Sequence, residues 1–233
     1  MEAVILVGGL GTRLRKAISD LPKAMAPVNG RPFLEYQLAY LKNNGITRVI
    51  LAVGYKKDYI ISHFGNKFLQ MDIAYAEEDQ PLGTGGAIMN AIHNVSEEQF
   101  YILNGDTIFD INLKKLQEVH QAKNADLTIA LRKVHDTSRY GAVAMGEDGR
   151  VKGFLEKGEA EGEGLINGGI YFGTRDFFDK IALKGKFSFE KEILELKYNK
   201  YLFYGVAFDD YFLDIGIPED YNRAQNEFKR FSY

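Results

Sequence analysis

The chain has 233 residues, 45% of them hydrophobic, which is enough to fill the core of one large α/β domain. A formal charge of −3 gives no reason to expect nucleic acid or an anionic membrane as a partner. Because the chain has no cysteine, disulfides, thiolate metal sites and cysteine nucleophiles are excluded. The first apolar run is too short for a signal peptide, and no stretch reaches the roughly 20 apolar residues of a membrane span, so we expect a cytoplasmic protein.

Apolar runs alternate with helical patterns in the first half of the chain. Four strands are expected: Ala3–Val7, Arg48–Val53, Ile73–Ala76 and Phe100–Leu103. Three helices are expected between them: Phe33–Asn43, which Gly45 ends, Asp58–Phe64 and Ala87–His93. The first two strands are nearly continuous in aliphatic residues, as parallel strands covered on both faces are. The order predicts an α/β fold with a doubly wound, mostly parallel, Rossmann-like sheet.

After residue 110 the pattern predicts a small mixed or antiparallel extension of that sheet. The expected strands are Asp126–Leu131, Gly141–Met145, Val151–Phe154, Ile166–Phe172 and Leu202–Phe208. The expected helices are Leu113–Ala122, Arg175–Ile181, Phe189–Lys197 and one that begins at Pro218. The acidic stretch 158–164 is expected to be a surface loop. No linker separates two domains, so we expect a single domain, 1–233, with halves 1–110 and 111–233.

The most informative segment runs from Val7 to Arg15 and reads Val-Gly-Gly-Leu-Gly-Thr-Arg-Leu-Arg. It follows the first strand directly, and ligands of open α/β sheets bind at the carboxyl ends of strands, where glycines let backbone N–H groups approach a phosphate. Leu14 stands where a dinucleotide fingerprint needs glycine, and the Gly-Lys pair at 185–186 precedes Phe187, so it is no Walker A loop. The alternative is a plain glycine turn, but the position after the strand and the basic residues Arg13 and Lys23 favour an anion site.

Gly-Gly-x-Gly-Thr-Arg-Leu, followed by Pro-Lys-x-Met-x-Pro-Val, resembles the signature of the sugar-1-phosphate nucleotidyltransferases. In that family the glycine loop, the arginine and the lysine grip a nucleoside triphosphate. The resemblance implies a nucleotide-binding set of Leu6, Gly8, Gly9, Gly11, Thr12, Arg13 and Lys23, with Arg13 and Lys23 as catalytic residues. The chain departs from the pattern where Arg15-Lys16 and Ala24 replace prolines that are frequent in the family, which weakens an assignment to its glucose- or thymidylyl-type members.

A second glycine-rich segment, residues 77–87, follows the third strand. Taken alone, it is an ordinary glycine turn with Thr84 as a helix cap, although its glycines would also let a flat ligand come close, and Gln80 offers a donor and an acceptor. Pro-Leu-Gly-Thr-x-Gly-Ala is similar to the base-recognition loop of the family, especially in its guanylyl-transferring members. The resemblance therefore assigns Gln80, Gly83 and Thr84 to the base.

Two aspartates follow apolar segments and need a partner or a metal ion. Asp106 ends the strand Tyr-Ile-Leu-Asn-Gly-Asp, and Asp214 lies in Phe-Leu-Asp-Ile-Gly-Ile-Pro. The resemblance makes them the two carboxylates that hold Mg²⁺, an ion that prefers oxygen ligands, with Asp106 also contacting the nucleotide. Asp110 is expected to cap the helix near Leu113. The nearby pair at 209–210 could be confused with the metal ligand.

Three further segments resemble sugar-phosphate contacts of the family, although each taken alone is a plain strand end. The implied set is Asn104, Tyr140, Gly141, Glu156, Lys157 and Asn167, with Lys157 pairing with the phosphate. Residues 1–110 would then be the nucleotide-binding half and 111–233 the sugar-phosphate-binding half. The four histidines show no metal or triad spacing, so we expect them to be structural or solvated.

The resemblance, which runs from Ile5 to Pro218, implies transfer of a nucleotidyl group to a sugar 1-phosphate with release of pyrophosphate. A phosphate monoester is already anionic at neutral pH, so the chemistry needs no general base. GTP and D-glycero-D-manno-heptose 1-phosphate are favoured, and a hexose 1-phosphate, UTP or CTP stays open. A non-catalytic nucleotide-sugar-binding regulatory subunit is an alternative function. The sequence leaves the oligomeric state open, and a homodimer through the main domain is one possibility. A glycosyltransferase is disfavoured, because Thr107 and Ile108 leave Asp106 without an Asp-x-Asp pair.

Overall fold

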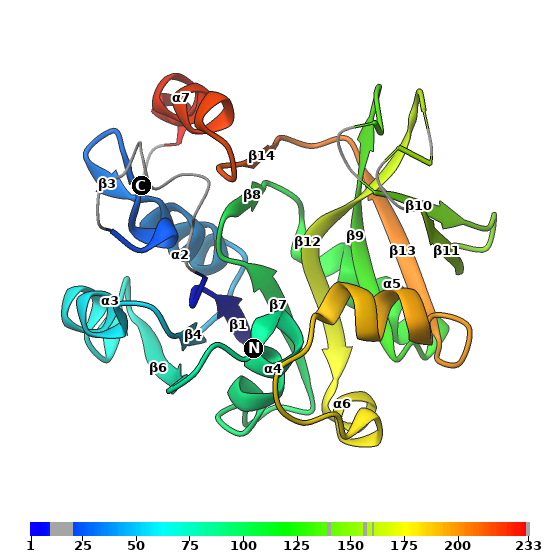
Figure 1. Cartoon of the computed structure of the whole chain (residues 1–233), viewed down its shortest axis with the longest axis horizontal. Helices are drawn as coiled ribbons and strands as arrows, with labels where there is room; N and C mark the ends of the chain where they lie inside the picture. The colour runs from blue at the N-terminus through cyan, green and yellow to red at the C-terminus, as the bar shows by residue number, and fades with distance from the viewer. Residues whose placement is uncertain (10–20, 139–140, 156–157, 160, 232–233) are drawn as a thin grey trace.

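The computed structural model describes residues 1–9, 21–138, 141–155, 158–159 and 161–231, and its main element is a ten-stranded sheet. The centre consists of β1 (Glu2–Leu6), β4 (Arg48–Val53), β6 (Met71–Glu77) and β7 (Gln99–Asn104), which are mutually parallel in the order β7-β1-β4-β6 (Figure 1). The predicted α/β fold with a mostly parallel sheet is confirmed. The strand bounds differ from the prediction by up to two residues at each end.

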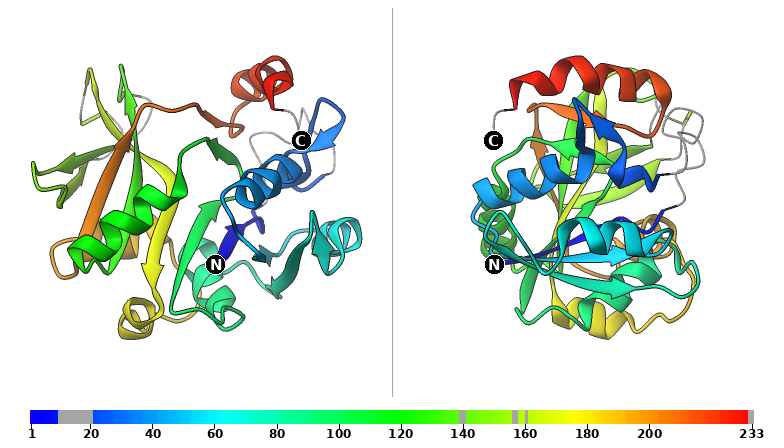
Figure 2. Two further views of the ribbon diagram at one scale, coloured as in Figure 1. Left: turned by 180° about the vertical axis from the view of Figure 1, so that it is seen from behind. Right: turned by 90° about the vertical axis from the view of Figure 1, so that its left-hand side faces the viewer.

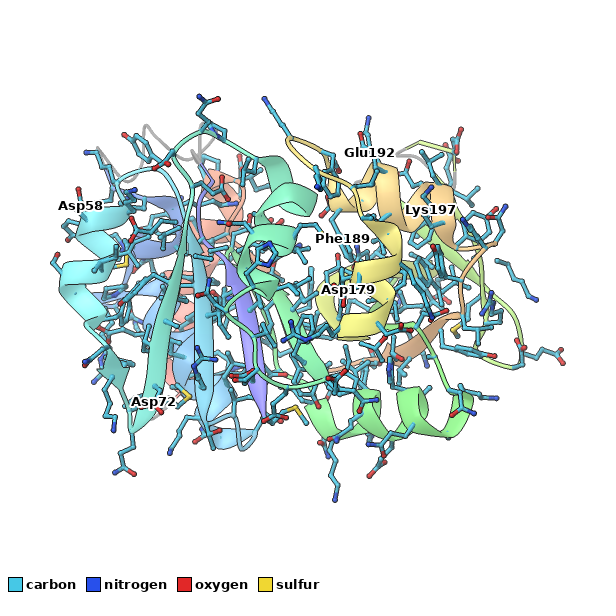
Figure 3. The ribbon with its side chains drawn as sticks, turned by 90° about the horizontal axis from the view of Figure 1, so that it is seen from below. Asp58, Asp72, Asp179, Phe189, Glu192 and Lys197 are labelled. Carbon is cyan, nitrogen blue, oxygen red and sulfur yellow. The ribbon has the colours of Figure 1, made fainter. Side chains whose placement is uncertain are left out.

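Alternating side chains of the central strands fill two separate cores. Ala3 and Ile5 belong to one hydrophobic cluster and Val4 to the other, because successive side chains of a strand point to opposite faces. The first face is covered by α2 (Phe33–Asn43), α3 (Lys57–Phe64) and α5 (Leu113–Lys123). The second is covered by α4 (Gly83–Ile92), α6 (Arg175–Ile181) and the π-helix η2 (Glu190–Glu195). Figure 3 shows α4 and the segments that carry Phe189 and Asp179 on one side of the sheet and α5 on the other.

The second half of the chain extends the same sheet with antiparallel strands. β12 (Gly164–Thr174) pairs antiparallel with β7 on one edge and with β9 (Leu127–Val134) on the other. β13 (Phe203–Phe208) lies parallel to β9, and β10 (Ala142–Met145) joins β11 (Val151–Leu155) to β12. The predicted mixed extension is therefore confirmed. The parallel β9–β13 pair was not foreseen, because 68 residues lie between the two strands and no local pattern indicates which distant segments will pair.

Helix ends were the least well predicted parts of the fold. α4 begins at Gly83, four residues before the expected start at Ala87, because Gly85 N donates to the Phe187 carbonyl oxygen at 3.0 Å and so anchors the first turn. The helix expected over residues 189–197 is present, but its centre is the π-helix η2. Gly45 ends α2 with a φ of +80°, as predicted.

The cap predicted at Asp110 is wrong. Asn112 caps α5, and its side chain accepts from Lys114 N at 3.0 Å. Asp110 lies two residues earlier, where its own backbone N–H donates to the Tyr211 carbonyl oxygen at 2.9 Å.

A third, smaller core lies beside the sheet. β8 (Thr107–Phe109) pairs antiparallel with β14 (Phe212–Asp214), and α7 (Pro218–Glu227) begins with the proline that was expected in its first turn. Residues of α7 and α2 share this cluster, and Figure 2 shows α7, in red, beside the blue α2. The remaining short elements are η1 (Lys23–Met25), β2 (Pro27–Val28), β3 (Arg31–Pro32), β5 (Lys67–Phe68) and η3 (Phe228–Arg230). Among the described helices, none has the length and apolar character needed to cross a membrane.

Candidate active site

A cavity of about 750 Å³ opens where β1, β4, β6 and β7 end. Each of these parallel strands contributes the residues that directly follow it, as expected for a ligand site of an open α/β sheet. The cavity is lined by Leu6, Val7, Gly8, Gly9, Lys23, Ala24, Gly54, Tyr55, Glu78, Asp79, Gln80, Pro81, Gly83, Thr84, Ala87, Asn104, Gly105, Asp106 and Glu190. Its volume suits a nucleotide.

The turn after β1 is held against the turn after β4. Tyr55 N donates to the Gly8 carbonyl oxygen at 3.4 Å, and a Cβ on Gly8 would lie 3.2 Å from Gly54 N. A larger residue at position 8 would push these two turns apart. Leu6, Gly8 and Gly9, which are predicted to bind the nucleotide, line the cavity. The other predicted members of the glycine loop, Gly11, Thr12 and Arg13, lie outside the described residues.

Asp106 and Asp214 come together because β8 and β14 pair. In this ladder Asp214 is opposite Thr107, and Ile215 N donates to the Asp106 carbonyl oxygen at 2.9 Å. Gly105, which positions Asp106, needs to be glycine because a Cβ there would collide with the Leu6 carbonyl oxygen. Two segments 108 positions apart in the sequence are thereby fixed to one point of the cavity rim.

Lys23 lies between these two carboxylates. Its Nζ is 2.5 Å from Asp106 Oδ2 and 3.8 Å from Asp214 Oδ1. The side chain of Lys23 is only 15% exposed, so its charge is held at this place rather than in solvent. Gly216 closes the cluster, because a Cβ there would lie 2.9 Å from Asp214 Oδ1 and 3.3 Å from Lys23 Nζ. Three residues predicted separately from the sequence therefore converge.

The cluster of Lys23, Asp106 and Asp214 carries more negative than positive charge. Burial, together with the neighbouring charge of Asp106, raises the pKa of Asp214 to about 6, although Lys23 opposes this shift. Two carboxylates that share one ammonium group leave one negative charge without a counter-ion. Their hard oxygen donors and this excess charge fit Mg²⁺, which proteins often hold through one or two carboxylates together with substrate phosphates. Among the described residues, no three acidic, histidine or cysteine side chains gather into a metal cluster.

The loop predicted to recognise the base lies on the cavity wall, but its glycines face the protein. Gly83 has a φ of +70°, and a Cβ on it would lie 2.5 Å from the Phe187 carbonyl oxygen. A Cβ on Gly85 or Gly86 would collide with the Phe187 ring or with the Gly185 carbonyl oxygen. The sequence Gly-Thr-Gly-Gly is therefore required by the segment that packs on the loop, whatever ligand the cavity holds.

Thr84 does not cap α4, because Leu82 is the residue that precedes the helix. Its hydroxyl donates to Glu190 Oε2 at 2.7 Å and accepts from Phe189 N at 2.8 Å. Gln80, the other predicted base contact, lines the cavity with an exposed side chain.

The chain matches the family model for nucleotidyl transferases over residues 2–230. The chain belongs to the nucleotidyl transferase family. A D-glycero-α-D-manno-heptose 1-phosphate guanylyltransferase of Aneurinibacillus thermoaerophilus is 48% identical over 231 residues, which are 99% of this chain and 100% of the relative. An enzyme of the same name from Campylobacter jejuni is 50% identical over 221 residues, 95% of this chain and 97% of the relative.

Two solved structures share the fold of this chain. HddC from Yersinia pseudotuberculosis, complexed with GMP-PN, superposes with a TM-score of 0.85 at 38% identity and covers 97% of this chain and 99% of that one. A putative glucose-1-phosphate thymidylyltransferase from Bacillus anthracis has the same TM-score at 21% identity, which shows the shared fold alone.

Glu78 of the nucleotidyltransferase lines the cavity, although the sequence motifs do not single it out. It directly follows β6, as Asp106 closely follows β7, so the rule that ligands bind at strand ends could have found it. Its Oε2 accepts from Leu82 N at 3.0 Å, and burial raises its pKa. Glu190 was missed as well, and no local signal indicates it, because only packing between the two halves brings it to Thr84.

Only some of the residues that are predicted to bind the sugar phosphate belong to the described part of the chain. Asn104 lines the cavity, and its side chain lies against Gly169, where a Cβ would be 2.8 Å from Asn104 Nδ2. The side chain of Asn167 forms two hydrogen bonds within the protein. Its Nδ2 donates to the Tyr171 hydroxyl at 2.7 Å, and its Oδ1 accepts from Gly169 N at 3.0 Å. Gly141 is exposed and does not line the cavity. Tyr140, Glu156 and Lys157 lie outside the described residues.

Two of the histidines, His63 and His120, and the neighbouring Asp209 have partners outside the cluster around Lys23. His63 lies 2.9 Å from Glu35, and buried His120 lies 3.0 Å from Thr128 Oγ1. Asp209 accepts from Arg132 at 2.5 Å, so it does not compete with Asp214 for the cluster around Lys23.

Proposed function

We propose that this nucleotidyltransferase converts GTP and D-glycero-D-manno-heptose 1-phosphate to a nucleotide sugar and pyrophosphate. An oxygen of the sugar 1-phosphate attacks the α-phosphorus of GTP, the bond from that phosphorus to the bridging oxygen breaks, and pyrophosphate leaves. The observation that carries the proposal is the convergence of Lys23, Asp106 and Asp214, of which Lys23 and Asp106 line the cavity that the strand ends form and Asp214 lies beside Lys23. The full-length similarity to two heptose 1-phosphate guanylyltransferases supports this choice of substrates.

The chain's own residues have to bring two polyanions together. The attacking phosphate is already anionic at neutral pH, so the main barrier is charge repulsion, and positioning with cations lowers it. Lys23 lies at the cavity with its ammonium group inside the cluster, where it can bind the triphosphate once its carboxylate partners have another counter-ion. Arg13 is proposed to bind the departing pyrophosphate, and Lys157 is proposed to bind the phosphate of the sugar 1-phosphate.

Asp106 and Asp214 are proposed to hold Mg²⁺. When bound, the ion would neutralise phosphate charge and orient the triphosphate. The geometry supports this role because both carboxylates lie next to the ammonium group of Lys23, and their combined negative charge is larger than its single positive charge.

We assign recognition of guanine to Glu78. The Watson–Crick edge of guanine carries two adjacent N–H donors, and an ionised carboxylate offers only acceptors. Glu78 is half-buried in the cavity wall, whereas Gln80 is exposed, so Glu78 is the better placed of the two to read the base. A carboxylate there disfavours adenine, whose corresponding ring nitrogen is an acceptor.

Pyrophosphate release measured with each of the four ribonucleoside triphosphates and a panel of sugar 1-phosphates tests the proposal. The panel should contain the heptose, mannose and glucose 1-phosphates, because a mannose-1-phosphate guanylyltransferase of Mycobacterium tuberculosis is 36% identical over 99% of this chain. We expect the highest kcat/KM with GTP and the heptose 1-phosphate. A higher value with a hexose would correct the substrate, and no turnover with any pair would favour a non-catalytic binding subunit.

A further inference from the structure

A segment of the second half of the chain forms part of the wall of the nucleotide cavity. Residues 185–190 connect α6 to η2 and pack on the loop that begins α4. Phe187 N donates to the Leu82 carbonyl oxygen at 3.0 Å, and Gly85 N donates back to the Phe187 carbonyl oxygen at 3.0 Å. Phe189 then turns into the core, where it is 1% exposed (Figure 3).

Glu190 is the charged residue at the centre of this contact. Its Oε2 accepts from Thr84 Oγ1 at 2.7 Å and from Ser188 Oγ at 3.0 Å. The side chain lines the same cavity as Glu78, Asp106 and Lys23, although Glu190 lies 106 positions after Thr84 in the chain. A single carboxylate oxygen therefore fixes both the base loop and the segment that covers it.

Loss of the hydrogen bond between Thr84 and Glu190 would destabilise the base loop. Hydrogen bonds to an ionised group contribute more than neutral ones, and a partner that is left unsatisfied in a partly buried place destabilises its surroundings further. Without Glu190, the Thr84 hydroxyl would keep only its bond from Phe189 N. The first turn of α4, which lines the cavity, would lose its charged side-chain contact with the segment 185–190 and would be held there by the bonds of Phe187 and of Phe189 N.

We propose that Glu190 is a positioning residue for nucleotide binding, acting through Thr84. It holds the base loop in the geometry that the nucleotide needs, and it does not contact the reacting phosphates. The inference rests on the proposed function for the identity of the nucleotide. Loss of the contact raises KM for GTP and leaves kcat nearly unchanged, because the cluster of Lys23, Asp106 and Asp214 lies on other segments.

The test is a double-mutant cycle with Glu190→Ala and Thr84→Val, measured as kcat and KM for GTP in the presence of Mg²⁺. Each single variant is expected to raise KM roughly tenfold, the effect of one lost hydrogen bond to a charged group. The double variant is expected to lose clearly less than the sum of the two single effects, because both changes remove the shared Thr84–Glu190 bond, whereas the bonds to Phe189 N and to Ser188 Oγ are each lost in only one of them. Glu190→Gln and Thr84→Ser retain the acceptor and the hydroxyl, so both should restore KM to within about threefold of the unchanged protein.

Glu192→Ala is the matched control. Glu192 Oε2 accepts from Ser188 N at 2.8 Å, so the variant loosens the same segment without touching Thr84 or the cavity. It should lower the melting temperature while KM stays unchanged. An equal rise in KM in Glu192→Ala would overturn the inference, as would additive effects in the cycle or a Glu190→Gln variant as impaired as Glu190→Ala. Failure of the proposed function is a separate result, since the unchanged protein would then give no pyrophosphate from GTP.

Discussion

Replacing Glu78 with glutamine tests how the cavity selects guanine. Leu82 N donates to Glu78 Oε2 at 3.0 Å, and in the variant the amide oxygen takes that place because only it can accept. The NH₂ group then occupies the position of the other oxygen, where it meets the N–H donors of guanine with a donor of its own. The substitution preserves shape and removes both the charge and one acceptor.

The expected loss is that of one hydrogen bond to a charged group, about 1.5–3 kcal/mol. This corresponds to a roughly tenfold to hundredfold lower kcat/KM for GTP. Inosine triphosphate, which lacks the exocyclic amine of guanine, provides the comparison. The unchanged protein should prefer GTP over ITP, and Glu78→Gln should reduce that preference to less than about threefold, measured by pyrophosphate release under matched conditions.

Gln80→Ala is the control, because Gln80 was the base contact predicted from the sequence and its side chain is exposed at the same cavity. We expect it to change the GTP/ITP ratio little. If Gln80→Ala abolished the preference while Glu78→Gln retained it, the assignment of Glu78 to guanine would be refuted.

Three further predictions concern residues that support the site. Burial lowers the pKa of His120 to about 4, so the unfolded chain binds a proton at pH 5 that the folded chain does not, and His120 should contribute a fall of about 2 kcal/mol in the unfolding free energy between pH 7 and pH 5. Asp214, whose pKa is raised to about 6, contributes in the opposite direction, so the measurement is the difference between the unchanged protein and His120→Asn in urea denaturation at the two pH values. Gly105→Ala would force Asp106 away from β1, so pyrophosphate release should drop at least about tenfold, and unchanged turnover would contradict the role of this turn. Glu2 is 3% exposed and binds Arg48 and Ser96, while Arg48 is partly exposed and keeps its bond to the Asn94 carbonyl oxygen, so Glu2→Ala should lower the unfolding free energy by about 1.5–3 kcal/mol, a loss that calorimetry should detect.

The central sheet could be predicted because its strands carry a local signal. β1 and β4 are runs of aliphatic residues that need cover on both faces, and this pattern is visible in the sequence without knowledge of the partners. The positions of Lys23 and Asp106 could be predicted from their motifs, and the structure brings them together with Asp214. Whether they act as assigned stays a prediction, as do Mg²⁺ binding, a homodimer and a cytoplasmic location.

Features that depend on distant packing could not be predicted. The short strand β14 has only three residues, and its pairing with β8 is what delivers Asp214 to Asp106. The early start of α4 depends on a bond to Phe187, which lies about one hundred positions away in the chain. A prediction from the local sequence alone therefore put the start of this helix too late. The same long-range packing brings Glu190 to Thr84, which no local pattern indicates, and places Thr84 inside α4 instead of at its cap.

Turnover of Asp106→Asn tests the claim that the cluster around Lys23 is the site of nucleotidyl transfer. The substitution removes one charge from a partly exposed side chain and keeps its shape, so the melting temperature should change little. We predict that pyrophosphate release from GTP and the heptose 1-phosphate falls by a factor of about one hundred or more at saturating Mg²⁺. A folded Asp106→Asn variant with near-normal nucleotide-sugar formation would contradict the account.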